Sequence, residues 1–282
     1  MSGRKEQVQS SLVTEFNESI WKKFLSAIKK YRLINKGDRI AVCISGGKDS
    51  MLMAALFARL KKYNIYDFDV TYVVMDPGYN SENRQLILQN AEMLEIPVKI
   101  FDVNIFNYVF KVNNNPCFLC AKMRRGHLYN EAKNLGCNKI ALGHHYDDVI
   151  ETILMGVLYS GCFQTMMPML KSDNYEGMTL IRPMYLIREK DVENWRDYND
   201  LIFLQCACRF TESCTDGSVS EESKSKRKEI KKLIAELKRN NPDVEKCIFA
   251  SVANVDLRRL ISYKNKGEKH SFLDEFLYSC NT

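Results

Sequence analysis

The hexapeptide at positions 45–50 constrains the fold of this chain more than any other segment. It reads Ser-Gly-Gly-Lys-Asp-Ser and separates an apolar run at 40–44 from a second apolar run at 51–56. The first run is typical of a buried parallel strand, and the second of the start of a packed helix. A glycine-rich turn between them brings free backbone N–H groups and the positive end of a helix dipole together, which favours a bound phosphate. The alternative is an ordinary Gly-Gly turn capped by serine.

Two well-known phosphate-binding loops do not fit this hexapeptide. Its glycines are not followed by the four-residue spacer and Gly-Lys-Ser/Thr of nucleoside triphosphatases, nor spaced as in dinucleotide-binding proteins. Residues 45–50 instead resemble the PP-loop of the N-type ATP pyrophosphatases, Ser-Gly-Gly-x-Asp-Ser. The resemblance implies that the loop binds the pyrophosphate portion of ATP and that the enzyme adenylates an oxygen atom of its substrate.

Strands and helices alternate through the middle of the chain. Apolar runs predict strands near 39–44, 69–75, 97–102, 138–142 and 179–183, with helices between them at 50–63, 81–95, 119–135 and 147–159. This alternation indicates an α/β fold with a doubly wound, mainly parallel sheet flanked by helices. Amphipathic patterns predict further helices at 12–33, 189–200 and 224–239. The expected organisation is an N-terminal helical segment (1–35), a PP-loop ATPase domain with a Cys-x-x-Cys insert (36–186) and a C-terminal helical region (187–282).

The composition narrows the class of protein. The 282 residues are 45% hydrophobic, which is enough for one large α/β domain and an appendage. The sequence has no apolar run of about 18 residues and its N-terminus lacks the apolar core of a signal peptide, so we expect a cytoplasmic protein without a membrane partner. A formal charge of +6 is compatible with a nucleic-acid partner. Ten cysteines in a reducing compartment favour metal binding or catalysis where they cluster.

Polar clusters follow three of the predicted strands at their carboxyl ends, where doubly wound sheets bind ligands. Lys48 is a candidate phosphate contact, and Asp49 a candidate ligand of Mg²⁺, because a carboxylate beside a phosphate requires a bridging cation. Asp147 and Asp148 either cap a helix or help to place this ion. The expected ATP-binding residues are therefore Ser45, Gly46, Gly47, Lys48, Asp49, Ser50, Met75, Gly143, Asp147 and Asp148.

Cys117 and Cys120 form a Cys-x-x-Cys motif that is preceded by proline and followed by Arg124 and Arg125. Two thiolates at this spacing can face one metal ion or cluster. A thioredoxin-like redox pair and a chance occurrence are the alternatives. The sequence has no second pair of this kind, so it does not support a four-cysteine zinc site. A further pair, Cys-x-Cys, occurs at 206–208.

Together, the PP-loop, the Pro-Cys-x-x-Cys with its two arginines, the Gly-His-x-x-Asp-Asp at 143–148 and the later cysteines resemble the TtcA family of tRNA 2-thiocytidine synthetases. The resemblance covers roughly residues 20–260. It implies a [4Fe-4S] cluster that is held by three cysteines, with one iron open to carry sulfide. The first two ligands correspond to Cys117 and Cys120. The third lies in a Cys-x-x-Cys in the family, so Cys206 is expected here, with Cys208 as the alternate ligand.

The same resemblance implies an ATP-dependent tRNA sulfurtransferase. ATP would adenylate the C2 oxygen of a pyrimidine, cytidine 32 of tRNA in the family, and sulfur would then displace AMP. The implied cofactors are ATP, Mg²⁺ and the [4Fe-4S] cluster; the implied partners are tRNA and a sulfur donor such as a cysteine desulfurase or sulfide. A homodimer is left open. The expected catalytic residues are Lys48, Asp49, Cys117, Cys120 and Cys206.

Two groups of cations are candidates for binding RNA. Arg124 and Arg125 can contact a phosphate of ATP or of RNA, or can lie on a solvated face. In the basic helix predicted at 224–239, charge density alone makes Lys226, Arg227, Lys231 and Lys232 candidates.

Three other functions stay open from the sequence. One is another PP-loop ligase resembling lysidine synthetase, in which the cysteines are structural or bind zinc. The second is a cluster-dependent thiolase or desulfurase that acts on a different nucleobase. The third is an ATP-sensing or RNA-binding protein without turnover, against which the full set of polar loop residues argues.

Overall fold

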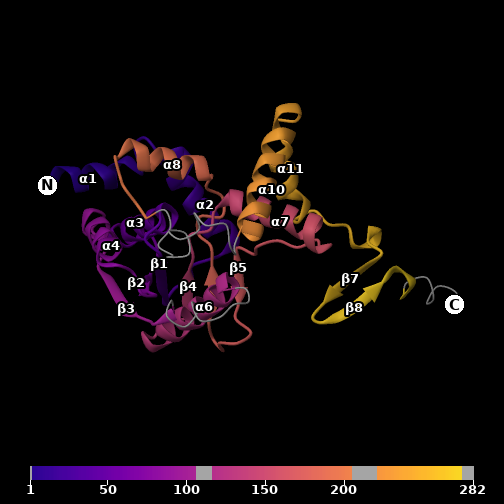
Figure 1. Cartoon of the computed structure of the whole chain (residues 1–282), viewed down its shortest axis with the longest axis horizontal. Coiled ribbons are helices and arrows are strands. Elements are labelled where there is room, and N and C mark those ends of the chain that lie inside the picture. Colours follow the sequence, from indigo (N-terminus) through magenta and orange to yellow (C-terminus); the bar gives the residue numbers. More distant parts are fainter. Residues whose placement is uncertain (1, 106–115, 205–220, 275–282) are drawn as a thin grey trace.

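The computed structural model describes residues 2–105, 116–204 and 221–274, without the side chains of 2, 116–118, 121 and 221–225. Six strands form one sheet in the order β3-β2-β1-β4-β6-β5 (Figure 1). Every neighbouring pair is parallel except β5 and β6. The mainly parallel sheet predicted from the sequence is therefore confirmed. The strands are β1 (Asp38–Ile44), β2 (Phe68–Asp76), β3 (Val98–Asp102), β4 (Lys139–Ala141), β5 (Met169–Lys171) and β6 (Thr179–Ile181).

The central strand β1 is buried on both faces, which explains its unbroken apolar run. Ile40, Val42 and Ile44 point into the larger core beneath α3 (Lys48–Lys62), whereas Ala41 and Cys43 point into a second core beneath α6 (Pro116–Asn134). This alternation follows from the two-residue period of a strand. Two more helices, α4 (Ser81–Met93) and α7 (Tyr146–Ser160), complete the helices of the central α/β unit.

The N-terminal segment differs from the single helix predicted at 12–33. It contains α1 (Ser2–Ser11), a π-helical turn η1 (Asn17–Trp21) and α2 (Lys22–Tyr31). Helix α1 is polar except for Val8, so its sequence carries no helical periodicity that would have predicted it. Both α1 and α2 nevertheless contribute to the larger core, through Val8, Phe24 and Ile28.

The C-terminal part begins with α8 (Glu189–Tyr198) and continues after the undescribed stretch with α10 (Glu221–Asn240) and α11 (Val244–Ser251). Helices α10 and α11 pack on α7 (Figure 1). A short turn, η3 (Leu257–Arg259), leads to a hairpin of β7 (Ser262–Asn265) and β8 (Glu268–Ser271), which projects away from the sheet. Within the described ranges, every helix falls short of the length and apolar character that crossing a bilayer requires.

Candidate active site

The candidate site lies where the order of the parallel strands reverses. From β1 the chain proceeds to β2 and β3 on one side, whereas β4 leads to β6 on the other. Doubly wound sheets bind ligands at this point, outside the carboxyl ends of the strands. The 45–50 loop leaves β1 here, and Gly143 follows the end of β4. A Cβ atom on Gly143 would lie 3.1 Å from backbone atoms of Asp49 and Ser50, so the missing side chain lets α3 approach β4 closely.

The loop at 45–50 is a compact turn held by its own serines. The Ser45 N–H donates to Ser50 Oγ at 3.1 Å, and the Ser50 hydroxyl donates to the Gly47 carbonyl at 3.0 Å. Gly46 has a φ of +87°, which a residue with a side chain rarely adopts. Among the described residues, no side chain caps α3 at Gly47. The first N–H groups of this helix can therefore bind the oxygens of a phosphate.

A cavity of about 460 Å³ opens beside the loop. Helix α6 contributes Arg124 and Arg125, two of the predicted RNA contacts, to its lining. Gly46, Lys48 and Asp147 are not among its lining residues. Seven of the ten residues predicted to bind ATP do line the cavity: Ser45, Gly47, Asp49, Ser50, Met75, Gly143 and Asp148.

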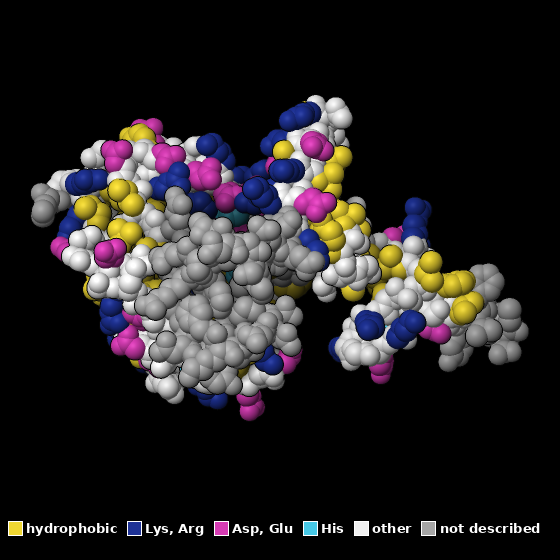
Figure 2. Space-filling view, viewed as in Figure 1, with side chains coloured by type: hydrophobic (Ala, Val, Ile, Leu, Met, Phe, Trp, Pro, Cys, Tyr) yellow, Lys and Arg dark blue, Asp and Glu magenta, His cyan; other side chains and the backbone are white. Residues whose placement is uncertain are grey.

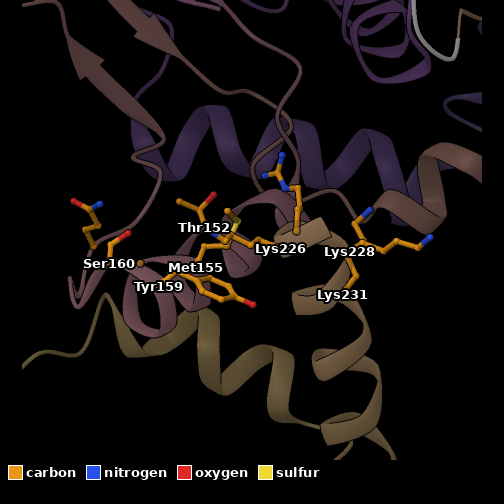
Figure 3. Close-up of a pocket in the computed structure, with 10 residues that line it drawn as sticks. Thr152, Met155, Tyr159, Ser160, Lys226, Lys228 and Lys231 are labelled. Atoms are coloured by element: carbon orange, nitrogen blue, oxygen red, sulfur yellow. The ribbon is translucent and has the colours of Figure 1, made fainter. Parts of the chain in front are cut away.

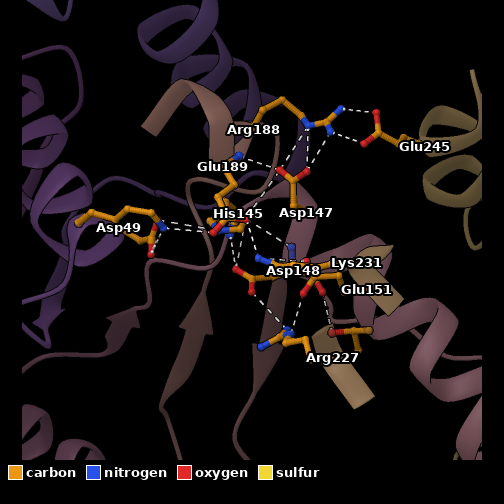
Figure 4. A network of polar contacts seen from close by, with 12 residues as sticks. Asp49, His145, Asp147, Asp148, Glu151, Arg188, Glu189, Arg227, Lys231 and Glu245 are labelled. Carbon is orange, nitrogen blue, oxygen red and sulfur yellow. Dashed lines mark hydrogen bonds and ion pairs between the residues drawn. The ribbon is translucent and has the colours of Figure 1, made fainter. Parts of the chain in front are cut away.

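Lys48 forms ion pairs with two carboxylates near the loop, those of Asp49 and Glu189, which are labelled in Figure 4. Its Nζ lies 3.0 Å from an Asp49 oxygen and 3.3 Å from an oxygen of Glu189, the first residue of α8. Partial burial opposes the charged form, but the two carboxylates outweigh it and raise the pKa of Lys48 above its ordinary value. Lys48 is therefore a fixed positive charge next to the first turn of α3.

Asp147 and Asp148 have different partners although they are adjacent. Asp147 pairs with Arg188 at 2.9 Å and accepts the Glu189 N–H at 2.7 Å, so it fixes the start of α8. Asp148 accepts the His145 N–H at 3.0 Å in a capping box at the start of α7. Asp148 also lines the cavity. The structure thus brings Asp148, rather than Asp147, to the predicted ATP site.

His144 is a neutral hydrogen-bond donor in the wall of the cavity. The Nε of Arg182 donates to its Nδ1 at 3.2 Å, so the imidazole carries its proton on Nε2. Burial and the charge of Arg182 lower the pKa of His144 to about 4. Arg182 was not among the site residues predicted from the sequence. Its position directly after β6, at the carboxyl end of a strand, was the signal that could have found it.

Helix α10 sends two of its predicted RNA-binding cations inward (Figure 4). Arg227 lies 3.2 Å from Asp148 and 2.7 Å from Glu151. The contact with Glu151 is an ion pair in which the Nε–H of Arg227 is not aligned for a hydrogen bond. Lys231 lies 2.7 Å from Glu189. Glu151 and Glu189 were not predicted as site residues. Glu189 links the PP-loop to α10, because it pairs with both Lys48 and Lys231.

The cysteines predicted to bind the cluster are only partly described. Cys120 lies half-buried on α6 in an apolar cluster that includes Met75, a residue of the cavity wall. The side chain of Cys117 lies outside the described residues, as do Cys206 and Cys208. The described chain before that stretch ends at Leu204, whose N–H donates to the Gly46 carbonyl at 3.1 Å. No group of three or more His, Cys, Asp or Glu side chains within the described ranges is arranged to hold a metal ion.

Comparison with known proteins gives consistent matches. Residues 16–208 match the family described as a PP-loop domain. A tRNA-cytidine(32) 2-sulfurtransferase from Pelobacter propionicus is 31% identical, over 86% of this chain and 87% of that protein. Another, from Anaeromyxobacter sp. (strain K), is 34% identical over 81% and 76%. The solved structure of the U34-tRNA thiolase NcsA from Methanococcus maripaludis with its [4Fe-4S] cluster shares the fold, with a TM-score of 0.62 and 20% identity over 83% and 79% of the two chains.

Proposed function

We propose the function of this chain from the family to which it belongs, the PP-loop family, in the group of the tRNA-cytidine(32) 2-sulfurtransferases. The proposed reaction is the ATP-dependent replacement of the C2 oxygen of cytidine 32 in tRNA by sulfur. AMP and pyrophosphate are the other products. The proposal also includes a sulfur donor, either sulfide itself or a cysteine desulfurase, whose persulfide sulfur a thiol reductant would have to reduce by two electrons before it leaves as sulfide.

One observation carries the proposal. Helix α6 lines the cavity beside the PP-loop, and it is the helix that begins with the Cys117-x-x-Cys120 motif. Gly46 of the PP-loop also accepts a hydrogen bond from the Leu204 N–H, at the end of the described chain. The helix that carries the Cys-x-x-Cys motif and the loop that would bind ATP therefore border the same cavity.

The residues of the cavity and of the adjoining PP-loop suit the adenylation step. The C2 oxygen attacks the α-phosphorus of ATP, and pyrophosphate leaves. The first N–H groups of α3 and Lys48 would bind the leaving pyrophosphate and stabilise its growing charge. Asp49 and Asp148 both line the cavity and would hold Mg²⁺ together with phosphate oxygens, since Mg²⁺ commonly uses one or two carboxylates. Arg124 and Arg125 of α6, which also line the cavity, would orient the phosphates.

The second step replaces AMP by sulfur. Sulfide adds to C2 of the adenylated base, and AMP leaves with the former C2 oxygen. Cys117 and Cys120 occupy the first turns of α6 three residues apart, a spacing that places both on one side of a helix. With Cys206, or Cys208 in its place, they would hold a [4Fe-4S] cluster. When bound by three thiolates, the cluster supplies an open iron site for sulfide.

Anaerobic reconstitution tests this function. The purified protein, loaded with iron and sulfide, is incubated with tRNA, ATP and Mg²⁺, and the tRNA nucleosides are analysed by mass spectrometry. We expect 2-thiocytidine to form only with ATP, together with one pyrophosphate per thiolated base. Cys120→Ala should abolish thiolation, whereas Cys162→Ala should not, because Cys162 is an exposed free thiol outside the cavity lining.

Two outcomes would contradict the proposal. Full activity without iron would favour a ligase in which the cysteines are structural. Release of pyrophosphate with tRNA but without any thiolated nucleoside would exclude sulfur transfer and leave only the adenylation step.

A further inference from the structure

A second hollow lies between α7 and α10, next to the PP-loop cavity. Its volume is about 820 Å³, and it is lined by residues of both helices and of the turn after α7 (Figure 3). Arg227 lines this groove and pairs at 3.2 Å with Asp148, which lines the cavity. The groove and the cavity are therefore adjacent, with one ion pair between them.

The four cations in the groove fall into two classes. Arg227 and Lys231 are balanced by carboxylates on α7 and α8, as described above. Lys226 and Lys228 have no carboxylate partner within the described part of the chain. The lining contains four cations, and no Asp or Glu of the described residues. The net charge of the lining is thus positive, and Lys226 and Lys228, which lack a carboxylate partner among the described residues, can bind an anion. Figure 2 shows Lys and Arg side chains along α10.

An aromatic ring and an amide accompany these cations. Tyr159 is 41% exposed, and its hydroxyl is hydrogen-bonded to Glu229. Lys226 lies 5.7 Å from the centre of the Tyr159 ring. The ring is therefore held in place with part of its surface open to solvent, and Gln164 offers both a donor and an acceptor nearby. The two apolar residues before Tyr159, Val157 and Leu158, are also exposed.

A single inorganic anion would not account for these features. Lysines alone suit phosphate, but a fixed ring and a groove of this volume suit a chain of nucleotides, whose phosphates bind cations while a base stacks on an aromatic side chain. RNA substrates are read mainly in single-stranded regions, where bases can leave the helix and stack on protein.

We propose that the α7–α10 groove binds a strand of RNA, with Lys226 and Lys228 at its phosphates and the Tyr159 ring against one base. A strand in this groove would pass Arg227 and reach the PP-loop cavity beyond it. The identification of the strand as substrate tRNA rests on the proposed function. The binding site itself is inferred only from the lining residues, the charge and the volume of the groove.

Binding measurements on the full-length protein test this proposal without any chemistry. Fluorescence anisotropy with labelled tRNA is recorded from about 50 to 300 mM KCl. Lys226→Gln/Lys228→Gln should weaken binding about tenfold and lower the slope of log Kd against log salt by about 1.5 to 2, as expected for two lost phosphate contacts. Tyr159→Leu should weaken binding about fivefold with an unchanged slope, because stacking releases no counterions.

The matched control is Lys62→Gln/Arg239→Gln. It removes the same charge at exposed positions, one at the far end of α3 from the PP-loop and one on α10 outside the groove lining. We expect tRNA affinity within twofold of the parent. An equal loss in the control would overturn the proposal, because the effect would then be that of overall charge. Loss of binding to phosphatidylglycerol vesicles, with tRNA binding unchanged, would assign the groove to a membrane surface and overturn it too.

The result also separates the two proposals. If the groove variants show the expected salt slope but the parent protein makes no thiolated nucleoside, the groove stands and the proposed function fails. If thiolation occurs and Lys226→Gln/Lys228→Gln binds tRNA normally, the function stands and the groove proposal fails.

Discussion

The PP-loop cavity and the α7–α10 groove are neighbours but are built in different ways. The cavity gathers residues from the ends of β1, β2 and β4 and from α6, and it contains both acids and cations. The groove is formed by two helices packed through Ile150, Ile230 and Ile234, and its lining is cationic. The first is a consequence of sheet topology. The groove depends on where the peripheral helix α10 packs on α7.

This difference indicates that the cavity and the groove have separate roles. A mixed set of charges can bind Mg²⁺ and polyphosphate together, because each carboxylate and each cation finds an opposite partner. A set of lysines without carboxylates binds an extended anion and gains affinity from released counterions. Substitutions in the cavity should therefore change the chemical step, and substitutions in the groove should change RNA binding.

The largest effect is expected for Lys48→Ala. The loss of the cation beside the leaving pyrophosphate should lower kcat for pyrophosphate release by about 10² to 10³-fold. The affinity for tRNA should stay within twofold, because Lys48 is not in the groove lining. Lys62→Ala, at the other end of the same helix, is the control and should retain full activity. A tRNA affinity that fell as far as the rate would show that the two regions do not act separately.

The same contrast explains what the sequence could predict. A buried parallel strand, a glycine turn and a packed helix have clear sequence patterns. The β1–loop–α3 unit and the five parallel strands could therefore be predicted from the sequence. The carboxyl ends of parallel strands meet at one edge, which is why Gly143 and Asp148 could be placed near the loop from sequence alone. The antiparallel strand β5 is short and exposed, and its sequence offered no strand signal.

Contacts between distant segments could not be predicted. The amphipathic pattern of α10 showed that Ile230 and Ile234 face a core, but not that Arg227 and Lys231 would meet Glu151 and Glu189. Side-chain pairing across elements depends on the packing of whole helices, on which a local pattern has no bearing. Asp147 illustrates the same limit, because its pairing with Arg188 joins positions far apart in the chain.

A medium effect is expected for Gly46→Ala, which tests whether the rigid backbone builds the cavity. The backbone at Gly46 has a φ of +87°, and a Cβ atom would lie 2.7 Å from Leu204 Cδ1 and 2.8 Å from Ile87 Cγ1. Strain and overpacking should together lower the free energy of unfolding by about 2 to 3 kcal/mol. Urea denaturation measures this change.

Gly37→Ala is the matched control for the strain alone. Gly37 has a φ of +78°, but a Cβ atom there would meet nothing within 4 Å. Its replacement should cost about 1 kcal/mol. Equal losses in the two variants would mean that Leu204 and Ile87 move aside freely, and that the loop is less tightly held than the cavity requires.

The smallest effect is expected for Glu189→Gln, at the residue that joins the two regions. Partial burial opposes ionisation of Glu189, but the hydrogen bond from Lys231 and the charge of Lys48 outweigh it and lower its pKa to about 2. The folded pKa thus lies below the unfolded value of about 4.5, so the unfolded state binds more protons between these two values. The stabilisation by Glu189 is present above about pH 5 and is lost as the pH falls toward 2. Because solvent screens this half-buried group, the loss should be about 1 kcal/mol.

Urea denaturation at neutral pH and at stepwise lower pH should therefore show a gap between the parent protein and Glu189→Gln that closes with acidification. Glu193→Gln, on the same helix, should show no such gap, because Glu193 pairs only with Lys190 at 3.7 Å among the described residues. Glu189→Gln should also raise KM for ATP, because Lys48 loses a carboxylate that positions it. It should weaken tRNA binding by less than twofold. A gap that stayed constant with pH would show that Glu189 stabilises the fold by packing rather than by charge, and would remove the electrostatic link between cavity and groove.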